Sequence, residues 1–487
     1  MTASKPSPAS AAPTVVWLRK DLRLADNHAL TAAAAAGPVI PLFILDDVFE
    51  TTLGAAAKLR LKLSLEALSR DLAQAGAPLI LRRGDALSVL RALTAETGAK
   101  AVTWTRLTDG AALDRDRRVK AALTEDGVSA DSHGGFTLVD PWTVKTGAGT
   151  QFKVYTPFWR AVSARDIERP LPRPKTIDGV EGVGSDVLDD WRLEAGMGPA
   201  ADALAIQIQA GEGAALDKLD AFLDGPAPHY AEDRDQMGLP NAVTQLSDNL
   251  AVGQISPRTI WWALMATGDT PGHTTARKQI VWRDFAHHLL FHDPEMEAKC
   301  WRREWEDFAW AGENDAARKW KAGRTGIDIV DAAMRELWVT GRMHNRARMI
   351  VASVMTKNLL VDWSVGEAWF RHTLIDWDPA NNAMGWQWVA GCGPDASPFF
   401  RIFNPATQAE KFDKSKTYRR RWLYQGEGAK SFKAMWPKSD VTLTLETPPL
   451  MVDLKATRQA ALSAWEDMKQ RRDEAASGVK ASIEESA

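Results

Sequence analysis

The stretch IDWDPANNAMGWQWVAGCG combines carboxylates, amides and tryptophans beside a glycine-rich turn. Asp376 and Asp378 come just before Pro379, and proline disfavours helix at the residue that precedes it, so these carboxylates should lie in a loop. Asn381 and Asn382 then stand at the start of a tryptophan-rich helical segment. One interpretation is a capped helix with solvated carboxylates. The other is a loop that carries hydrogen-bond acceptors and amides to a bound ligand.

Tryptophan is abundant around this stretch. The chain has 21 Trp against 4 Tyr, and many of the tryptophans fall between Trp261 and Trp388. Most of them are expected to form an aromatic core, because indole rings bury large apolar areas. Their number also suggests a second use, since some of them could carry electrons through the protein.

Basic and aromatic side chains flank the stretch on both sides. The segments QIVWRDFAHHLLFHDP and GRMHNRARM carry, at helical spacing, Trp282, Arg283, His344, Asn345, Arg346, Arg348 and Met349. The segment FFRIFNPATQAEKFDKSKTYRRRW adds Arg401, Lys411, Lys414, Lys416, Arg419, Arg420 and Arg421. Such runs are often only solvated faces. Aromatic rings interleaved with arginine also suit a nucleic acid, because bases stack on the rings while guanidinium groups hold phosphates.

Metal and hydrolytic chemistry find little support. His288 and His292 have metal-ligand spacing on one helical face, but no HExxH glutamate or third ligand stands nearby. Packing or cofactor contact is therefore favoured, and no metal is expected. The chain lacks a GxSxG elbow, a P-loop and a cysteine–histidine nucleophile pattern. Cys300 and Cys392 are too few for a disulfide framework, which favours a reducing compartment.

The elements that must position these residues are of two kinds. Short apolar runs (TVVWL, PVIPLFIL, PLILR, AVTWT and FTLVD) first alternate with amphipathic helical patterns, which predicts an α/β fold with a parallel sheet. No GxGxxG follows the first run, so a dinucleotide on this domain is not supported. Helical periodicity then dominates. The predicted division is 13–145 (α/β domain), 146–201 (linker), 202–465 (all-α domain) and 466–487 (disordered tail).

The totals restrict the location and the partners. The formal net charge is -3, so any site for a polyanion must be a local patch. The first residues lack the apolar core of a signal peptide, and no run of eighteen apolar residues occurs. We therefore expect a cytoplasmic protein.

The motifs WRDF, TGIDIVDAAMRELWVTGRMHNRARM, ANNAMGWQW and FFRIFNP together resemble the photolyase/cryptochrome family, and most closely its bacterial cyclobutane pyrimidine dimer (CPD) photolyases. The similarity extends from VVWLRKDLRLADNHAL to FNPATQAEKFD, which is nearly the whole chain. It implies an N-terminal α/β antenna domain, a linker and a helical domain that binds FAD. In this family, reduced flavin excited by blue light gives an electron to the dimer, the cyclobutane ring splits and the electron returns.

The resemblance assigns roles to numbered positions. Trp386, Trp363 and Trp310 match the chain that passes electrons to oxidised FAD, and Trp369 with Trp377 would form a second branch. Positions matching the flavin ring site are Asn382, facing flavin N5, Asp376 and Asp378 near the flavin edge, and Arg348, pairing with Asp376. Positions matching the FAD phosphate site are Tyr230, Thr244, Gln245, Leu246, Ser247 and Arg283. Positions matching contacts to DNA and its lesion are Arg234, Trp282, Asn345, Arg346, Met349, Trp388 and Arg401.

Three positions depart from the family pattern. Gln279 stands where CPD photolyases carry a glutamate that hydrogen-bonds the lesion, and glutamine cannot supply a proton. Arg342 replaces a tryptophan that packs near the flavin. Gln245 replaces an arginine of the phosphate segment, which suggests less positive charge and weaker or altered FAD binding. The antenna chromophore is expected to be 5,10-methenyltetrahydrofolate, with a deazaflavin or an empty pocket as alternatives.

Repair of CPDs in UV-damaged DNA by a monomeric enzyme is the leading hypothesis. A cryptochrome-like photoreceptor is the second, but signalling members often carry an extended C-terminal tail and this chain has a short one. A (6-4) photolyase is the third, disfavoured because MHNRARM lacks the paired histidines of that chemistry. An architectural DNA-binding protein is disfavoured because Asn382, Asp376 and the three tryptophans are retained.

Overall fold

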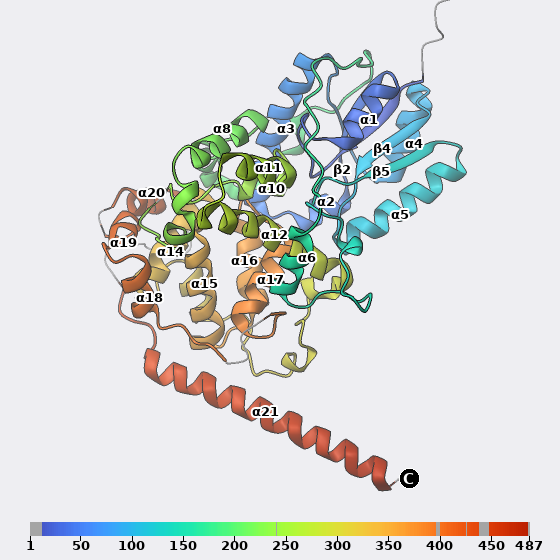
Figure 1. Ribbon diagram of the computed structural model, residues 1–487. Helices are drawn as coiled ribbons and strands as arrows, with labels where there is room; N and C mark the ends of the chain where they lie inside the picture. The colour runs from blue at the N-terminus through green and yellow to red at the C-terminus, as the bar shows by residue number, and fades with distance from the viewer. Residues whose placement is uncertain (1–11, 240, 396–399, 425, 438–447, 486–487) are drawn as a thin grey trace, which may run out of the picture.

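The computed structural model describes residues 12–239, 241–395, 400–424, 426–437 and 448–485. Figure 1 shows a strand-containing layer built from the N-terminal part of the chain beside a larger body of helices. Within the described residues, no helix combines the length and the apolar content that crossing a membrane requires.

A five-stranded parallel sheet forms the centre of the N-terminal part, in the order β3-β2-β1-β4-β5. Its strands are β1 (Thr14–Leu18), β2 (Val39–Leu45), β3 (Ile80–Arg83), β4 (Ala101–Thr105) and β5 (Ser129–His133). Every residue of β1 and β2 is buried, which explains their unbroken apolar sequences, because a parallel sheet is covered on both faces. The predicted α/β fold is confirmed.

Helices cover both faces of this sheet. On one face, α1 (His28–Ala36) and α3 (Ala55–Ala75) share a core with alternate residues of β1 and β2. On the other face, α4 (Ala86–Thr97) and α5 (Gly110–Glu125) pack against the remaining residues of these strands. The short α2 (Asp47–Thr52) follows β2.

The fifth strand does not lie where the sequence predicted it. The strand is SADSH rather than FTLVD, because it pairs with β4 alone at the edge of the sheet and needs no apolar run there. The FTLVD segment satisfies its backbone differently. The N–H groups of Leu138 and Val139 donate to the two carboxylate oxygens of Asp284 at 3.1 and 3.0 Å. A side chain of the helical body thus replaces a strand partner.

The predicted linker is packed against the rest of the protein. It contains α6 (Tyr155–Ser163) and then runs beside the sheet, where the Ile177 N–H donates to the Ala75 carbonyl at 2.7 Å. The Val39 N–H of β2 also donates to the Asp178 carbonyl at 2.7 Å. These contacts hold the linker to the α/β domain.

The helical body forms two apolar cores, and α12 packs against α6, α9, α11 and α17. Its helices are α7 (Ala201–Ala205), α8 (Glu212–Leu223), α9 (Tyr230–Asp233), α10 (Ser247–Val252), α11 (Pro257–Thr267), α12 (Pro271–His292), α13 (Asp315–Lys321), α14 (Asp328–Thr340), α15 (Asn345–Ser353), α16 (Trp363–Thr373), α17 (Pro379–Ala390), α18 (Pro405–Phe412), α19 (Thr417–Trp422) and α20 (Glu427–Met435).

The C-terminal segment differs from its prediction as a disordered tail. Helix α21 runs from Leu454 to Glu485 and extends away from the helical body (Figure 1). Near its start, the Trp465 ring stacks on Phe400 with centroids 5.6 Å apart. The rest is rich in Ala, Glu, Lys and Arg, which favour helix without needing an apolar face.

Candidate active site

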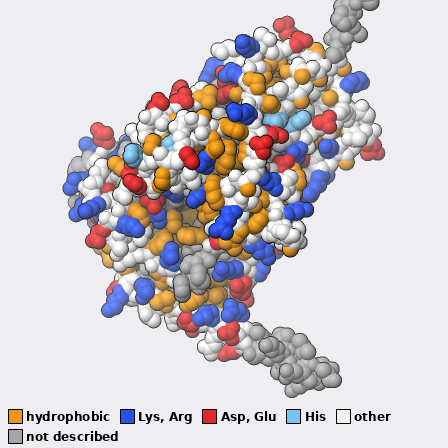
Figure 2. Space-filling model, viewed as in Figure 1, with side chains coloured by type: hydrophobic (Ala, Val, Ile, Leu, Met, Phe, Trp, Pro, Cys, Tyr) orange, Lys and Arg blue, Asp and Glu red, His pale blue; other side chains and the backbone are white. Residues whose placement is uncertain are grey.

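A cavity of about 1090 Å³ opens in the helical body. Figure 2 shows hydrophobic side chains gathered across the middle of this face, with Lys and Arg side chains around them. The predicted site residues that line the cavity are Tyr230, Arg234, Thr244, Gln245, Leu246, Ser247, Gln279, Trp282, Arg283, Asn345, Arg346, Arg348, Met349, Asp376, Asp378, Asn382, Trp386 and Trp388. Trp310, Trp363 and Arg401 are not part of this lining. The cavity is large enough for a cofactor and part of a substrate.

Helix α12 brings three of these side chains to one wall. The Thr270 side chain caps the helix by accepting from the His273 N–H, and Pro271 occupies the first turn. Gln279, Trp282 and Arg283 follow at helical spacing, so they face the same cavity. The Gln279 amide donates to the carbonyl one turn earlier at 3.4 Å.

A buried ion pair stands on the opposite side of the cavity. The Arg348 guanidinium lies 2.7 Å from Oδ2 of Asp376 and also donates to the Met343 carbonyl at 2.9 Å. Only 4 % of the Asp376 side chain is exposed, and its Oδ1 has no hydrogen-bond partner among the described residues. A buried acceptor without a partner is costly, so this oxygen is suited to a donor on a bound molecule.

Asp378 caps α17 and orients the neighbouring amides. Its Oδ1 accepts from the backbone N–H and the side-chain amide of Asn381 at 2.8 and 2.7 Å. The Asn382 amide in turn donates to the Asp378 carbonyl at 3.0 Å, which fixes the direction that this amide faces. The helix-cap interpretation is therefore confirmed, but both carboxylates of the loop are buried and line the cavity instead of being solvated.

The α/β domain supports Asp378 through His287. The Thr108 hydroxyl lies 2.9 Å from Nδ1 of His287, and Nε2 of His287 lies 3.3 Å from the Asp378 carboxylate. Burial lowers the pKa of His287, so a neutral ring can accept from the hydroxyl and donate to the carboxylate. Burial alone would raise the pKa of Asp378, but His287 and the charges of Lys20 and Arg283 hold it well below its usual range. Asp378 is therefore ionised.

A second charged group lies where the phosphate segment meets the cavity. The buried Asp248 carboxylate lies 3.3 Å from Arg60, 2.9 Å from Arg342 and 3.4 Å from Lys218. Burial would raise the pKa of Asp248, but these cations lower it. The Arg342 guanidinium also donates to the Gln245 side-chain oxygen at 3.5 Å. Arg342 thus places a guanidinium group beside Gln245.

Two tryptophans form apolar surfaces on another part of the cavity wall. The Trp282 ring stacks on Tyr155, with centroids 3.6 Å apart and an angle of 8° between the planes. The Trp388 indole N–H donates to the Asp395 carbonyl at 3.1 Å, and the Tyr155 N–H donates to the Asp395 carboxylate at 3.3 Å. Tyr155 and Asp395 therefore hold both tryptophans in place.

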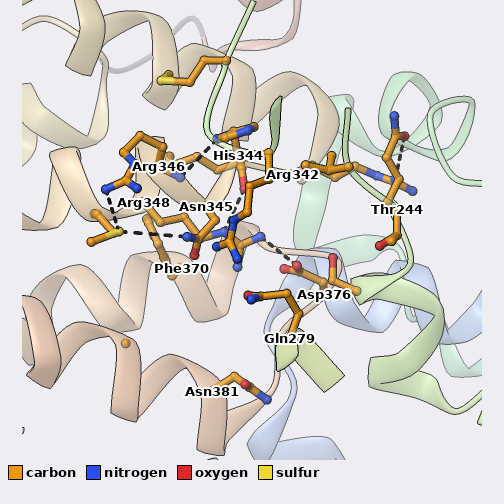
Figure 3. Close-up of a pocket in the computed structure, with 18 of the residues that line it drawn as sticks. Thr244, Gln279, Arg342, His344, Asn345, Arg346, Arg348, Phe370, Asp376 and Asn381 are labelled. Atoms are coloured by element: carbon orange, nitrogen blue, oxygen red, sulfur yellow. Dashed lines mark hydrogen bonds and ion pairs between the residues drawn. The ribbon is translucent and has the colours of Figure 1, made fainter. Parts of the chain in front are cut away.

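Helix α15 supplies the polar side chains beside these rings. His344 caps the helix, and its Nδ1 accepts from the Arg346 N–H at 3.1 Å. The Arg346 guanidinium pairs with Asp235 and lies 4.3 Å from the centroid of the Phe412 ring. The Asn345 amide is near the sulfur of the residue one turn later, and Figure 3 shows this group of side chains projecting into the cavity. Arg346 is thus a partly neutralised cation.

The three tryptophans of the predicted electron chain lie on neighbouring elements without direct ring contact among the described residues. Trp386 packs against Phe370 with centroids 4.9 Å apart. A Cβ on Gly366 would lie 2.2 Å from the Trp386 ring, so only glycine lets that ring approach α16, whose first residue is Trp363. Trp310 lies outside this contact, and its indole N–H donates to a carbonyl of the segment after α15 at 3.4 Å.

The second predicted branch has a different setting. Trp369 stacks on Trp338, with centroids 5.8 Å apart, and both rings contact Trp436. Trp377 is buried, and its indole nitrogen has no hydrogen-bond partner among the described residues.

Several cavity or supporting residues were missed by the sequence analysis. They are Tyr155, His287, Glu336, Phe370, Asp395 and Tyr418. Tyr418 donates to Glu336, which is buried enough that its pKa is raised to about 7. Partners so far apart in the chain leave no local pattern.

His288 has partners on both ring nitrogens, at Pro141 and Phe152, which agrees with its predicted packing role. The described residues contain no metal-binding cluster.

Known proteins share this chain's domains and fold. Residues 14–175 match the DNA photolyase family model, and residues 276–467 match the model of the FAD binding domain of DNA photolyase. The deoxyribodipyrimidine photo-lyase of Agrobacterium fabrum is 44% identical over 94% of this chain and 98% of that relative. Cryptochrome-1 of Arabidopsis thaliana is 34% identical over 84% of this chain and 62% of its own length.

A solved structure extends the similarity to three dimensions. The crystal structure of a bacterial class III photolyase from Agrobacterium tumefaciens is 43% identical and matches with a TM-score of 0.88, over 96% of this chain and 100% of that one. Three observations agree: these matches, the two-part architecture, and the motifs of α12 and of the loop before α17. This chain belongs to the photolyase/cryptochrome family.

Proposed function

We propose that this protein is a deoxyribodipyrimidine photo-lyase, which uses FAD and blue light to split cyclobutane pyrimidine dimers in UV-damaged DNA. One observation carries the proposal: a single cavity is lined both by the residues expected at the flavin and by those expected at the lesion. Electron transfer from cofactor to substrate requires this proximity. The 44% identity to a curated photo-lyase supports the same activity.

The residues present fit FAD. Asp376 offers an acceptor oxygen without a protein partner, and Arg283 offers a buried Nη2 without one, which are groups that a flavin nucleotide can satisfy. Arg348 pairs with Asp376, and the fixed Asn382 amide would meet flavin N5. The hydroxyl groups of Tyr230, Thr244 and Ser247, with Arg342, would hold the phosphates. Bound FAD in its reduced form supplies the light-driven electron.

The lesion would enter the same cavity from the DNA side. Photolyases belong to the enzymes that flip their target base out of the stack. Trp282 and Trp388 offer apolar surfaces for the flipped dimer, while Asn345 and Gln279 offer amides to the polar edges of its bases. An electron that returns after ring splitting leaves no net change in protons, so Gln279 can serve in place of a glutamate.

Phosphate contacts would come from the basic side chains around the opening. Arg234 and Arg421 line the cavity. Arg401 is exposed and lies shortly before α18 in the sequence. These groups would give affinity for any DNA, because phosphate contacts carry no sequence or lesion information. Preference for damaged DNA would depend on the tryptophan-lined part.

Photoreduction of resting oxidised FAD would use Trp386, Trp363 and Trp310. The burial of Trp386 against Phe370 and α16 supports its place as the first donor. Trp369 and Trp377 are proposed as a second branch, for which the stacked Trp338 and Trp436 would add further aromatic rings.

We also propose that residues 13–145 carry an antenna chromophore, with 5,10-methenyltetrahydrofolate preferred, and that the enzyme acts as a monomer in the cytoplasm. A photoreceptor role is the alternative. It is less supported because the cryptochrome relative is 34% identical and the chain spans 62% of its length. Repair of (6-4) lesions is also less supported, because Asn345 and Met349 line the cavity where that chemistry would need histidines.

Light-dependent repair tests the proposal. FAD-loaded protein is chemically reduced and incubated with oligonucleotides that contain either a CPD or a (6-4) lesion, under blue light and in the dark. Recovery of thymine absorbance only with the CPD and only under light is the expected result. Recovery with the (6-4) substrate alone, or no recovery by fully reduced holoprotein, would overturn it.

A further inference from the structure

Two cysteines that are far apart in sequence meet next to a tryptophan of the predicted electron chain. Cys300 follows α12 and Cys392 follows α17, and the Arg302 N–H donates to the Cys392 carbonyl at 2.9 Å. Both thiols are buried. Burial raises the pKa of Cys392 well above its ordinary value, and hydrogen bonding with Cys300 raises it further. The hydrogen bond from Arg302 to Cys392 joins the segment after α12 to the segment after α17, so the two buried thiols lie in adjoining segments.

Cys300 also contacts the middle tryptophan. The indole N–H of Trp363 donates to the sulfur of Cys300 at 3.4 Å. A sulfur atom in contact with an indole ring can pass an electron to that ring after the ring has been oxidised. This contact connects the thiol pair to the path that Trp363 is proposed to serve.

A buried amine completes the group. The Lys357 side chain is 1 % exposed and donates to the Ala390 carbonyl at 2.7 Å. Its nitrogen lies 3.4 Å from the centroid of the Phe400 ring. Burial lowers the pKa of Lys357 well below its ordinary value, while Cys392 raises it. The lowered pKa favours the deprotonated amine, which is the form that can accept a proton lost by a thiol on oxidation.

We propose that Cys300 and Cys392 form a redox-active dithiol that reduces photo-oxidised Trp363 and closes to a disulfide. This inference rests on the proposed function, because it needs light-driven oxidation of the tryptophan by the cofactor. It gives the protein an internal donor for one complete two-electron reduction of oxidised FAD.

The electrons and protons balance over two photochemical events. In the first, oxidised Trp363 takes one electron from the Cys300 sulfur, and the thiol proton leaves. In the second, the tryptophan takes one electron from the sulfur pair as the S–S bond forms and the Cys392 proton passes to Lys357. Two thiols thus lose two electrons and two protons. Oxidised FAD takes up two electrons and one proton, and the second proton stays on Lys357.

The experiment uses FAD-loaded full-length protein without an added electron donor. The protein is illuminated under anaerobic conditions, the absorbance of oxidised flavin is followed, and free thiols are then labelled and counted by mass spectrometry. The chain has 2 Cys, so every thiol that disappears belongs to this pair. We expect flavin reduction with the loss of two thiols per flavin and a Cys300–Cys392 disulfide peptide. Flavin reduction with both thiols still free would overturn the inference.

Three variants separate this inference from the proposed function. Cys300→Ser should lose donor-free reduction and Cys392→Ser should stop after the first electron, yet both should be fully photoreduced when a soluble donor is added. Trp363→Phe should lose thiol oxidation as well as donor-free reduction. Donor-free reduction that persists in both cysteine variants would overturn the dithiol alone. If wild-type holoprotein is not photoreduced even with a soluble donor, the proposed photoreduction path fails and the dithiol inference fails with it.

Discussion

The guanidinium of Arg342 lies 3.5 Å from the side-chain oxygen of Gln245 and 2.9 Å from the Asp248 carboxylate. These residues include two of the three departures from the family pattern, and the structure makes them neighbours. An arginine lost from the phosphate segment is thereby replaced by one from the turn after α14.

Arg342→Ala should weaken FAD binding on the order of tenfold, because a hydrogen bond from a charged group contributes about 1.5 kcal/mol. Equilibrium binding of FAD to the apoprotein measures the change. The double variant Arg342→Ala with Gln245→Arg, which places an arginine in the phosphate segment instead, should recover most of the affinity for FAD. Arg117→Ala is the matched control, since Arg117 is 69 % exposed on the distant α5. Equal affinity of wild type and Arg342→Ala would contradict this assignment.

Trp386→Phe should abolish photoreduction of oxidised FAD with a soluble donor, because phenylalanine keeps the packing against Phe370 but is much harder to oxidise. Trp363→Phe should have the same effect. Flavin absorbance during continuous illumination measures it. Trp369→Phe and Trp377→Phe serve as matched replacements on the second branch, and a large loss in either would make that branch the main path.

Asp284 should make the stability of the protein depend on pH. Burial raises its pKa to about 7, so the folded protein keeps a proton that the unfolded chain releases above about pH 4. The free energy of unfolding should therefore fall as pH rises through this window, by on the order of 2 kcal/mol between about pH 5 and about pH 7.

Urea unfolding of wild type and Asp284→Asn isolates this contribution. Other carboxyl groups, such as those of Asp331 and Glu336, also have a raised pKa and affect both proteins alike. The variant should have a flatter pH profile because asparagine does not titrate. Parallel profiles would show that Asp284 is not the protonated group.

Trp282→Ala should erase the preference for damaged DNA, because the ring that stacks on Tyr155 forms the wall for the flipped lesion. Arg401→Ala should instead weaken binding to damaged and undamaged DNA alike and reduce the salt dependence by about one phosphate contact. Titrations at several salt concentrations measure both effects. A lesion preference that survives in Trp282→Ala would place the lesion pocket elsewhere.

Most of the fold could be predicted from the sequence, and each wrong prediction has a local cause. Strands β1 to β4 are buried on both faces or nearly so, and their apolar runs identify them. The edge strand β5 carries SADSH and leaves no such signal, while FTLVD is apolar because it packs on α12. The segment 466–487 was expected to be disordered from its low apolar content, but helix propensity does not depend on an apolar face.

The site was predictable where one motif supplies the residues. The loop before α17 and the start of that helix contain Asp376, Asp378 and Asn382 within one short motif, and their types alone suggest a ligand. Contacts between segments that are distant in the sequence leave no pattern in the sequence itself. The pairing of Arg342 with Gln245 and the meeting of Cys300 with Cys392 depend on how the helices pack, which periodicity does not encode.

The most direct measurement is the fluorescence of reduced FAD bound to the protein, with and without DNA that carries a single CPD. If one cavity holds both the cofactor and the flipped dimer, electron transfer to the dimer should quench the emission, and undamaged DNA of the same sequence should leave it unchanged. The emission should recover as illumination repairs the lesion. Tight binding of the CPD-containing DNA with no change in emission would contradict the central claim.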